Sequence, residues 1–269
     1  MRTYVAPSDD NPDIMMLVVG DTVQSSVDLS DPTHLVDEYT QHLSILLDVA
    51  APSRRPLRVL HLGAGGLALA RYVAATRPGS YQQAVDIDAD VVEQVRRLAP
   101  LARGVRVKVR IGDAREQLAA APDDCYDVIV ADVFSGPFVP AHLTTVEFLA
   151  QVARVLRPGG CFGANVCDRR SSLFSRGMAA AVGEVFADAA VLSEPGVLNG
   201  RRFGNVLLFG AAGGLPVAEI QRRCAGSTFP YRVLHGREFE RFLGGTPATT
   251  DATAVRSPEP PPSLFSPRS

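Results

Sequence analysis

The sequence predicts an α/β fold: a seven-stranded, mainly parallel sheet with helices on both faces, preceded by a small N-terminal β-hairpin unit. From residue 57 onward, short apolar runs alternate with segments of helical periodicity, which is the pattern of parallel strands connected through helices. The apolar runs are nearly continuous, as in strands that are buried on both faces. Such sheets bind ligands beyond the carboxyl ends of their strands.

The elements can be placed in chain order. Residues 14–29 hold two short apolar runs around Gly20-Asp21 and predict a hairpin, and residues 34–50 have the leucine spacing of a helix. Strands are expected at 58–62, 83–87, 105–111, 126–132, 161–166, 189–192 and 205–210. Helices are expected at 66–76, 89–99, 114–121, 144–156 and 171–187, with short helical segments at 216–225 and 235–243.

This pattern divides the chain into three parts. Residues 1–50 form the small unit of hairpin and first helix, and residues 51–245 form the large α/β domain. Residues 246–269 are rich in Pro, Ser and Thr. Because so polar a segment has little apolar surface to bury, we expect a disordered tail.

Composition gives no support to several classes of partner. The 269 residues include 27 basic and 29 acidic side chains, a net charge of -2, so no general basic field attracts nucleic acid or an anionic membrane. The N-terminus has no apolar signal segment, and no run approaches the length of a membrane span. The four cysteines lack CxxC spacing and the five histidines are scattered. We therefore expect a cytoplasmic protein without a metal site.

The first strand of the large domain leads into a glycine-rich loop. Gly63, Gly65 and Gly66 allow a tight turn and a close approach of a ligand to the start of the next helix. Taken alone, this loop fits NAD, FAD or an adenosyl sulfonium donor equally well.

An acid follows each of the next three strands. Asp86 lies 23 positions after Gly63, near the separation of about 20 at which a carboxylate meets ribose hydroxyls. Asp88 competes for that role, and the other acid is expected to cap the following helix. Asp113 either caps its helix or accepts a hydrogen bond from the adenine amine. Asp132 ends the fourth strand, where a charge beside a core must be paired, solvated or functional.

The motifs occur in the order of a known family. The hairpin with "GDTVQS", then "LGAGG", "VDIDADVVE", "IGDA", "YDVIVADVFSGP" and "LRPGG" make the chain resemble the spermidine synthase (polyamine aminopropyltransferase) family over about residues 14–210. The resemblance implies the class I AdoMet-dependent methyltransferase fold, with residues 51–245 as the catalytic domain. This combination favours an AdoMet-type transferase over a dehydrogenase.

The resemblance also implies roles by position. Gln24 would line the donor pocket, Gly63 and Gly65 would face the sulfonium end, Asp86 would hold the ribose and Asp113 would read the adenine. Asp132 would be the catalytic carboxylate beside the attacking amine. The implied reaction, part of polyamine biosynthesis, is aminopropyl transfer from decarboxylated AdoMet to an amine or polyamine acceptor. A homodimer is also implied.

Two positions depart from the family. Gly66 stands where the family has an Asp for the donor's ammonium, and Ser135 stands where it has a second Asp. Ser135, His34 and Tyr39 are expected at the acceptor pocket, helix packing being the alternative for the last two. Asp31, Asp37 and Glu38 could compensate if the first helix folds over the site. The departures keep two alternatives open: a methyltransferase that uses AdoMet on a small molecule, and a non-catalytic nucleoside-binding or interaction protein.

Overall fold

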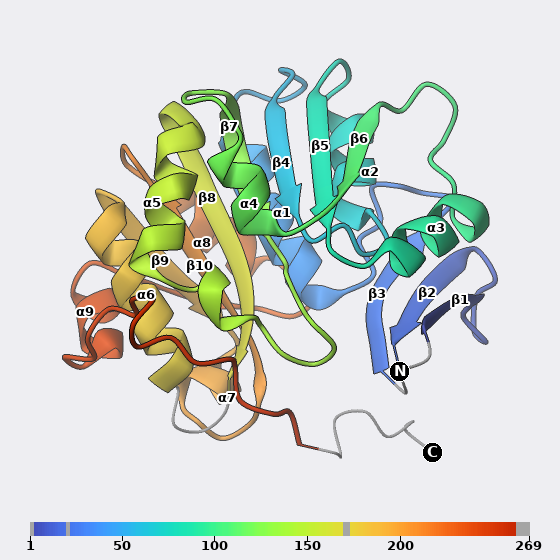
Figure 1. Cartoon of the computed structure of the whole chain (residues 1–269). Coiled ribbons are helices and arrows are strands. Elements are labelled where there is room, and N and C mark those ends of the chain that lie inside the picture. The colour runs from blue at the N-terminus through green and yellow to red at the C-terminus, as the bar shows by residue number, and fades with distance from the viewer. Residues whose placement is uncertain (1–2, 20–21, 169–172, 262–269) are drawn as a thin grey trace.

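A central sheet of eight strands organises the molecule, and a separate three-stranded sheet precedes it in the computed structural model (Figure 1). The structure describes residues 3–19, 22–168 and 173–261. The large sheet has the order β11-β9-β10-β8-β7-β4-β5-β6. Its strands are β4 (Arg58–Leu62), β5 (Tyr81–Asp86), β6 (Val107–Ile111), β7 (Tyr126–Ala131), β8 (Leu156–Asp168), β9 (Asp188–Ser193), β10 (Gly204–Ala211) and β11 (Arg232–His235).

Five neighbouring strands of this sheet are parallel: β8, β7, β4, β5 and β6. β10 pairs antiparallel with β8, β9 pairs antiparallel with β10, and β11 pairs antiparallel with β9. The mainly parallel sheet is thus confirmed, with eight strands in place of the seven predicted. The extra strand, β11, is four residues long, too short to stand out as a periodic run. Helices connect and flank the strands: α1 (Glu38–Val49), α2 (Ala68–Thr76), α3 (Ala89–Leu98), α4 (Ala114–Ala119), η1 (Ala141–Leu143), α5 (Val146–Val155), α6 (Leu173–Val185), α7 (Pro195–Leu198), α8 (Val217–Ala225) and α9 (Arg237–Leu243).

The N-terminal unit is larger than the expected hairpin. β2 (Ile14–Val19) and β3 (Thr22–Asp28) form it as predicted, and β1 (Thr3–Pro7) adds a third antiparallel strand. The Gly20-Asp21 turn lies outside the described residues. Leu17 of this sheet packs against Val91 and Val95 of α3, so the small sheet is attached beside the glycine loop.

Helices cover both faces of the large sheet. Side chains of α4, α5, α6 and α9 share one apolar core with the sheet, and those of α1, α2 and α8 share the other. Leu43, Leu46 and Leu47 of α1 are fully buried in the second core. α1 therefore belongs to the core of the large domain, although the sequence pattern places this helix in the small unit of residues 1–50.

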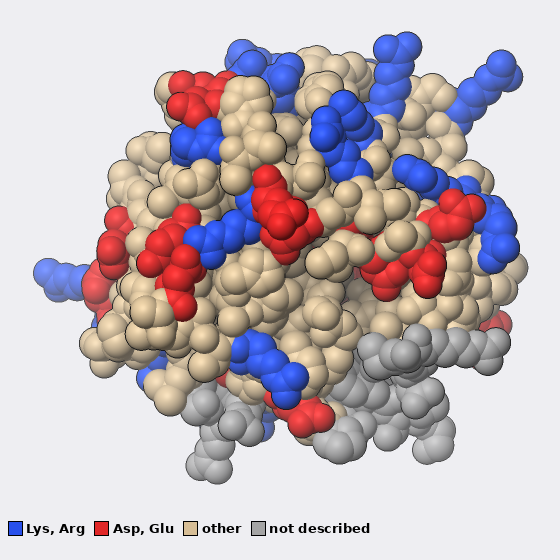
Figure 2. Space-filling view, in the orientation of Figure 1, with Lys and Arg blue, Asp and Glu red and all other residues tan. Residues whose placement is uncertain are grey.

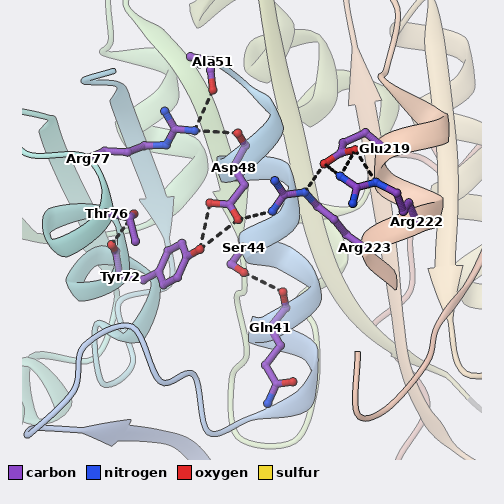
Figure 3. Close-up of polar contacts among 10 residues, drawn as sticks. All are labelled: Gln41, Ser44, Asp48, Ala51, Tyr72, Thr76, Arg77, Glu219, Arg222 and Arg223. Carbon is purple, nitrogen blue, oxygen red and sulfur yellow. Dashed lines mark hydrogen bonds and ion pairs between the residues drawn. The ribbon is translucent and has the colours of Figure 1, made fainter. Parts of the chain in front are cut away.

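A polar network connects the C-terminal end of α1 to its neighbours (Figure 3). Asp48 accepts a hydrogen bond from the Tyr72 hydroxyl of α2 and pairs with Arg223 of α8 at 2.8 Å. The buried Arg77 guanidinium donates to four backbone carbonyl oxygens between residues 48 and 55. Because α1 is fixed at this end, the position of its other end relative to the sheet is also fixed.

The C-terminal segment differs from the disordered tail that its composition predicts. Residues 246–261 are described, and Thr249, Asp251 and Ser257 hydrogen-bond to the large domain. Backbone groups and single side chains make these contacts, without an apolar repeat, so composition could not reveal them. Residues 262–269 lie outside the described part.

Charges are interspersed on the face shown in Figure 2, with acidic groups over α4 and near the start of α3. Within the described ranges, no helix has the length and apolarity that a bilayer crossing requires. The same residues contain no cluster of three or more His, Cys, Asp or Glu side chains that could hold a metal ion.

Candidate active site

A cavity of about 360 Å³ lies at the carboxyl ends of β4, β5 and β7, beneath the small N-terminal sheet. That volume is typical of pockets for small ligands. Eight of the nine residues predicted from the sequence line it: Gln24, Tyr39, Gly63, Gly65, Asp86, Asp113, Asp132 and Ser135. These residues therefore gather at the sheet edge where the topological rule for parallel sheets places ligands.

His34, the ninth predicted residue, is not among the described residues that line the cavity. Its side chain is half exposed, and its Nδ1 atom lies 2.8 Å from the Asp28 carboxylate. This pair stabilises the chain between β3 and α1. The acceptor role for His34 has no support in the geometry.

The glycine loop fits tightly against the end of β7. Gly63 has a φ of +87°, and a Cβ atom built on it would lie 2.0 Å from the carbonyl oxygen of Asp132. Glycine is required there on both counts. The Asp86 carboxylate accepts hydrogen bonds from the backbone N–H groups of Ala64 and Gly65. Asp86 thus shapes the loop and presents its carboxylate to the cavity.

A helix cap distinguishes the two acids near the end of β5 that compete for the ribose. Asp88 accepts hydrogen bonds from the N–H groups of Asp90 and Val91 at the start of α3. Asp86 caps no helix, and its second oxygen accepts the N–H of Asp88. The geometry therefore leaves Asp86 as the candidate for ribose, as predicted from the residues.

Asp113 caps its helix, which is one of the two functions that its position suggested. One carboxylate oxygen caps α4 through the N–H groups of Arg115 and Glu116. The other lies 2.8 Å from Nε2 of His142, which also lines the cavity. Burial opposes ionisation of Asp113, but the hydrogen bonds from His142 and the α4 backbone outweigh it and lower the pKa of Asp113. Asp113 lines the cavity as an ionised carboxylate, and its adenine role stays a prediction.

Asp132 is the carboxylate with the most unusual surroundings. The Tyr39 hydroxyl donates to one of its oxygens at 2.9 Å, and the Asn165 amide donates to the other at 3.0 Å. Burial raises the pKa of Asp132 to about 6, although both hydrogen bonds act in the opposite direction. A carboxylate with this pKa is ionised at neutral pH and is a stronger base than an exposed one.

The start of α1 lies over the same edge, which answers whether the first helix covers the site. Tyr39 belongs to its first turn, and Asp37 precedes it and accepts the N–H of Ser26 in β3. Burial raises the pKa of Asp37. Neither Asp37 nor Asp132 has an Arg or Lys partner among the described residues. Two carboxylates near each other without a cation form a region of negative potential.

The two family departures have different structural reasons. A Cβ atom on Gly66 would lie 2.9 Å from Val27 Cγ1 and 3.1 Å from Ser25 Oγ, so β3 occupies the space that a side chain would need. Ser135 lies on an exposed turn, where its N–H donates to the carbonyl of Phe138. A larger side chain fits at position 135 but not at position 66.

Sequence reasoning missed Asn165 and the floor made by Ser25 and Val27. Asn165 is 2% exposed, and its side-chain oxygen has no hydrogen-bond partner among the described residues. It stands on β8 one position past Ala164, the partner of the last residue of β7. A polar residue near the end of an apolar strand, beside Asp132 in the sheet order, was the signal available.

Comparison with known proteins agrees with the fold. Residues 59–160 match a family described as a methyltransferase domain. A probable spermidine synthase from Corynebacterium glutamicum superposes with a TM-score of 0.85 and 29% identity, covering 93% of this chain and 92% of the other. The chain therefore has the fold of this spermidine synthase neighbour and of the methyltransferase domain. Thermotoga maritima spermidine synthase, at 19% identity and a TM-score of 0.57, shares that fold.

Curated relatives match shorter segments. A polyamine aminopropyltransferase from Vibrio vulnificus is 33% identical over 113 residues, which cover 41% of this chain and 38% of the relative. One from Chromobacterium violaceum is 30% identical over 146 residues, which cover 54% of each. The chain thus spans about half or less of the length of these relatives. Their activity applies to this chain only as a proposal.

Proposed function

We propose that this protein transfers an aminopropyl group from decarboxylated AdoMet to a small amine or polyamine. The observation that carries the proposal is Asp132, a carboxylate with a pKa of about 6 that faces a cavity of nucleoside size. It lies directly behind the glycine loop, where the sulfonium end of an adenosyl donor would lie if Asp86 holds the ribose. An amine beside Asp132 would then be close to the carbon that it attacks.

The charges of the cavity favour cationic ligands. Four aspartates line it, Asp86, Asp88, Asp113 and Asp132, and its described lining includes no Arg or Lys. Decarboxylated AdoMet carries a sulfonium and an ammonium, and an amine acceptor adds further positive charge. AdoMet carries a carboxylate as well, for which the described lining offers no Arg or Lys. Opposite charges therefore support the decarboxylated donor.

The chemistry requires a neutral amine. An amine with a pKa near 10.4 costs about 5 kcal/mol to deprotonate at pH 7. Its nitrogen attacks the carbon bound to the sulfonium, a C–N bond forms, the C–S bond breaks, and methylthioadenosine leaves with the bonding electrons. The proton that the nitrogen loses passes to an Asp132 oxygen. Tyr39 and Asn165 hold that carboxylate in place.

Donor preference tests this proposal directly. The protein is incubated with a mixture of diamines and polyamines and either donor, and the nucleoside product is identified by mass spectrometry. Methylthioadenosine formed from decarboxylated AdoMet is the expected result. Ser135→Asp, at an exposed position, is the matched variant: the added charge should tighten binding of the decarboxylated donor severalfold in calorimetry. S-Adenosylhomocysteine as the only product would instead establish methyl transfer.

Methyl transfer is the second candidate, and one observation weakens the case for the decarboxylated donor. Because β3 fills the space at Gly66, the loop has no carboxylate for a donor ammonium. The same Asp132 could accept the proton of an amine that receives a methyl group. Absence of both nucleoside products with every amine would support the third possibility, a protein that binds a nucleoside without catalysis. A cytoplasmic location and a homodimer stay predictions, and light scattering tests the second.

A further inference from the structure

The C-terminal strap, residues 246–257, crosses from the end of α9 to the loop that follows β7 (Figure 1). Its first anchor is Thr249. The N–H of Thr249 donates to the carbonyl of Gly177 in α6, and its carbonyl accepts the N–H of Val146 in α5. A Cβ atom on Gly177 would lie 2.5 Å from the Thr249 hydroxyl oxygen. A glycine in this helix therefore lets the strap lie close against it.

The second anchor joins the strap to the start of α4. Arg115 pairs with Asp251 through two hydrogen bonds of 2.7 Å each. The N–H of Asp251 donates to the Glu147 carboxylate. Arg115 stands two residues after Asp113 and also donates to the carbonyl of His142. The strap is thus tied to both residues at the predicted adenine end of the cavity.

The third anchor holds the loop itself. Ser257 and Val139 exchange two hydrogen bonds: Val139 N–H to the serine hydroxyl at 2.9 Å, and Ser257 N–H to the Val139 carbonyl at 3.2 Å. Both residues are at most 3% exposed. Arg256 stacks over the ring of Phe138, with its guanidinium carbon 4.1 Å from the ring centre. Residues 138 and 139 are therefore clamped from the outside.

The inner side of the same loop lines the cavity, through Val133, Phe134, Ser135, Gly136 and Pro140. Ser135 and Phe138 close a small turn by a pair of backbone hydrogen bonds. The strap therefore contacts the loop on the side opposite the ligand. Any movement of Val139 away from Ser257 would carry cavity-lining residues with it.

We propose that Arg256 and Ser257 are positioning residues that hold loop 133–140 against the donor cavity before the donor binds. A loop that is already ordered loses less conformational freedom on binding. Loss of the clamp would then weaken donor binding and leave the bond-making step, at Asp132, nearly unchanged. The part of this inference that concerns turnover rests on the proposed transfer activity, whereas the part that concerns loop order does not.

The test uses full-length Arg256→Gln, Ser257→Ala and the double variant. Thr253→Ala is the matched control, because among the described residues the Thr253 hydroxyl bonds only to Thr250, within the strap. Hydrogen exchange is followed by mass spectrometry for residues 133–140 and for β4 and α2. Binding of methylthioadenosine is measured by calorimetry, and KM and kcat are measured for the donor.

The double variant should exchange about tenfold faster in residues 133–140, with β4 and α2 unchanged, since only local order is lost. Its methylthioadenosine affinity should fall and its donor KM rise by about tenfold, with kcat within twofold of the parent. Arg256→Gln should show part of this effect, and Thr253→Ala none. Unchanged exchange in the loop, or equally faster exchange throughout the domain, would overturn the inference. Absence of any transfer would refute the proposed function alone, because exchange and nucleoside binding still report on the clamp.

Discussion

α1 has a carboxylate close to each of its ends, and the partners of these two carboxylates differ. Asp48, at the C-terminal end, pairs with Arg223 and accepts the Tyr72 hydroxyl (Figure 3). Asp37, just before the N-terminal end, faces Asp132 across Tyr39. No Arg or Lys in the described part of the chain pairs with Asp37 or Asp132.

The difference indicates which end is built for a ligand. Burial raises the pKa of Asp37 and of Asp132, so ionisation of these groups opposes folding. Arrangements that cost stability persist where function requires them. At the C-terminal end of α1, the carboxylate pairs with groups of the protein itself, and this pairing fixes the helix. At the N-terminal end, the negative charge stays available for a cationic ligand.

Asp132→Asn should have the largest effect. Turnover should fall by about 10² to 10⁴, the usual contribution of a general base. Stability should change in the opposite direction. The pKa of Asp132 rises from 3.8 to about 6 on folding, so the ionised group opposes folding fully above pH 6 and not at all below about pH 4. The variant should therefore gain up to about 3 kcal/mol in the free energy of unfolding at pH 8.

Urea unfolding at pH 8 and pH 4, together with product formation, measures both effects. Donor binding, followed by calorimetry, should persist in the variant. Turnover equal to that of the parent would remove Asp132 from the mechanism. A loss of stability at pH 8 would show that the carboxylate is not strained in the fold.

Arg77→Met tests the other end of the comparison. The Arg77 side chain is 2% exposed and satisfies the carbonyls of Asp48, Ala51, Pro52 and Arg55. Four partly buried acceptors would lose their donor, and we expect a loss of about 3 kcal/mol in the free energy of unfolding. Arg55→Met, at an exposed neighbour, is the control. Activity of the folded fraction at 20 °C should stay within twofold of the parent, and a large drop in kcat would contradict the separation of the two ends.

Much of the site could be predicted because it depends on chain order. Gly63, Asp86, Asp113 and Asp132 each follow a strand of a parallel sheet, and such positions share one edge. The strap could not be predicted in this way. Arg115 and Asp251 are 136 residues apart, and Ser257 and Val139 are 118 apart. Such contacts depend on the path of the chain through space, and a Pro- and Ser-rich composition gives no periodic sign of them.

Asn165 and the β3 floor show a second limit. Asn165 lies within an apolar strand, so the sequence pattern predicts a core position for it. Its place in the sheet beside the end of β7 identifies it as a partner of Asp132. The space at Gly66 is closed by Ser25 and Val27, which come from a different sheet. Sequence comparison revealed the missing Asp but not that the position has no room for one.

Tyr39→Phe should have an intermediate effect. The Tyr39 hydroxyl lowers the pKa of Asp132, so its removal should raise that pKa above 6. The acidic limb of the pH profile of kcat should move up by about one pH unit, which lowers the rate at pH 7 about twofold because about half of Asp132 is then protonated. Tyr72→Phe, which removes the equivalent hydroxyl from the paired Asp48, is the control. The same shift in both variants would show that it does not originate at the active site.

Arg223→Gln should have the smallest effect and defines the comparison most finely. The side chain of Arg223 is 39% exposed and pairs with both Asp48 and Glu219. Exposed pairs contribute about 0 to 1 kcal/mol and are screened by salt. The variant should lose less than about 1 kcal/mol in low salt and almost nothing in about 0.5 M salt. Arg222→Gln, which affects only a pair within α8, is the control. A lower kcat of Arg223→Gln in a folded protein would contradict this separation. The ion pair between Arg223 and Asp48 would then control the position of Tyr39, and the two ends of α1 would act as one unit.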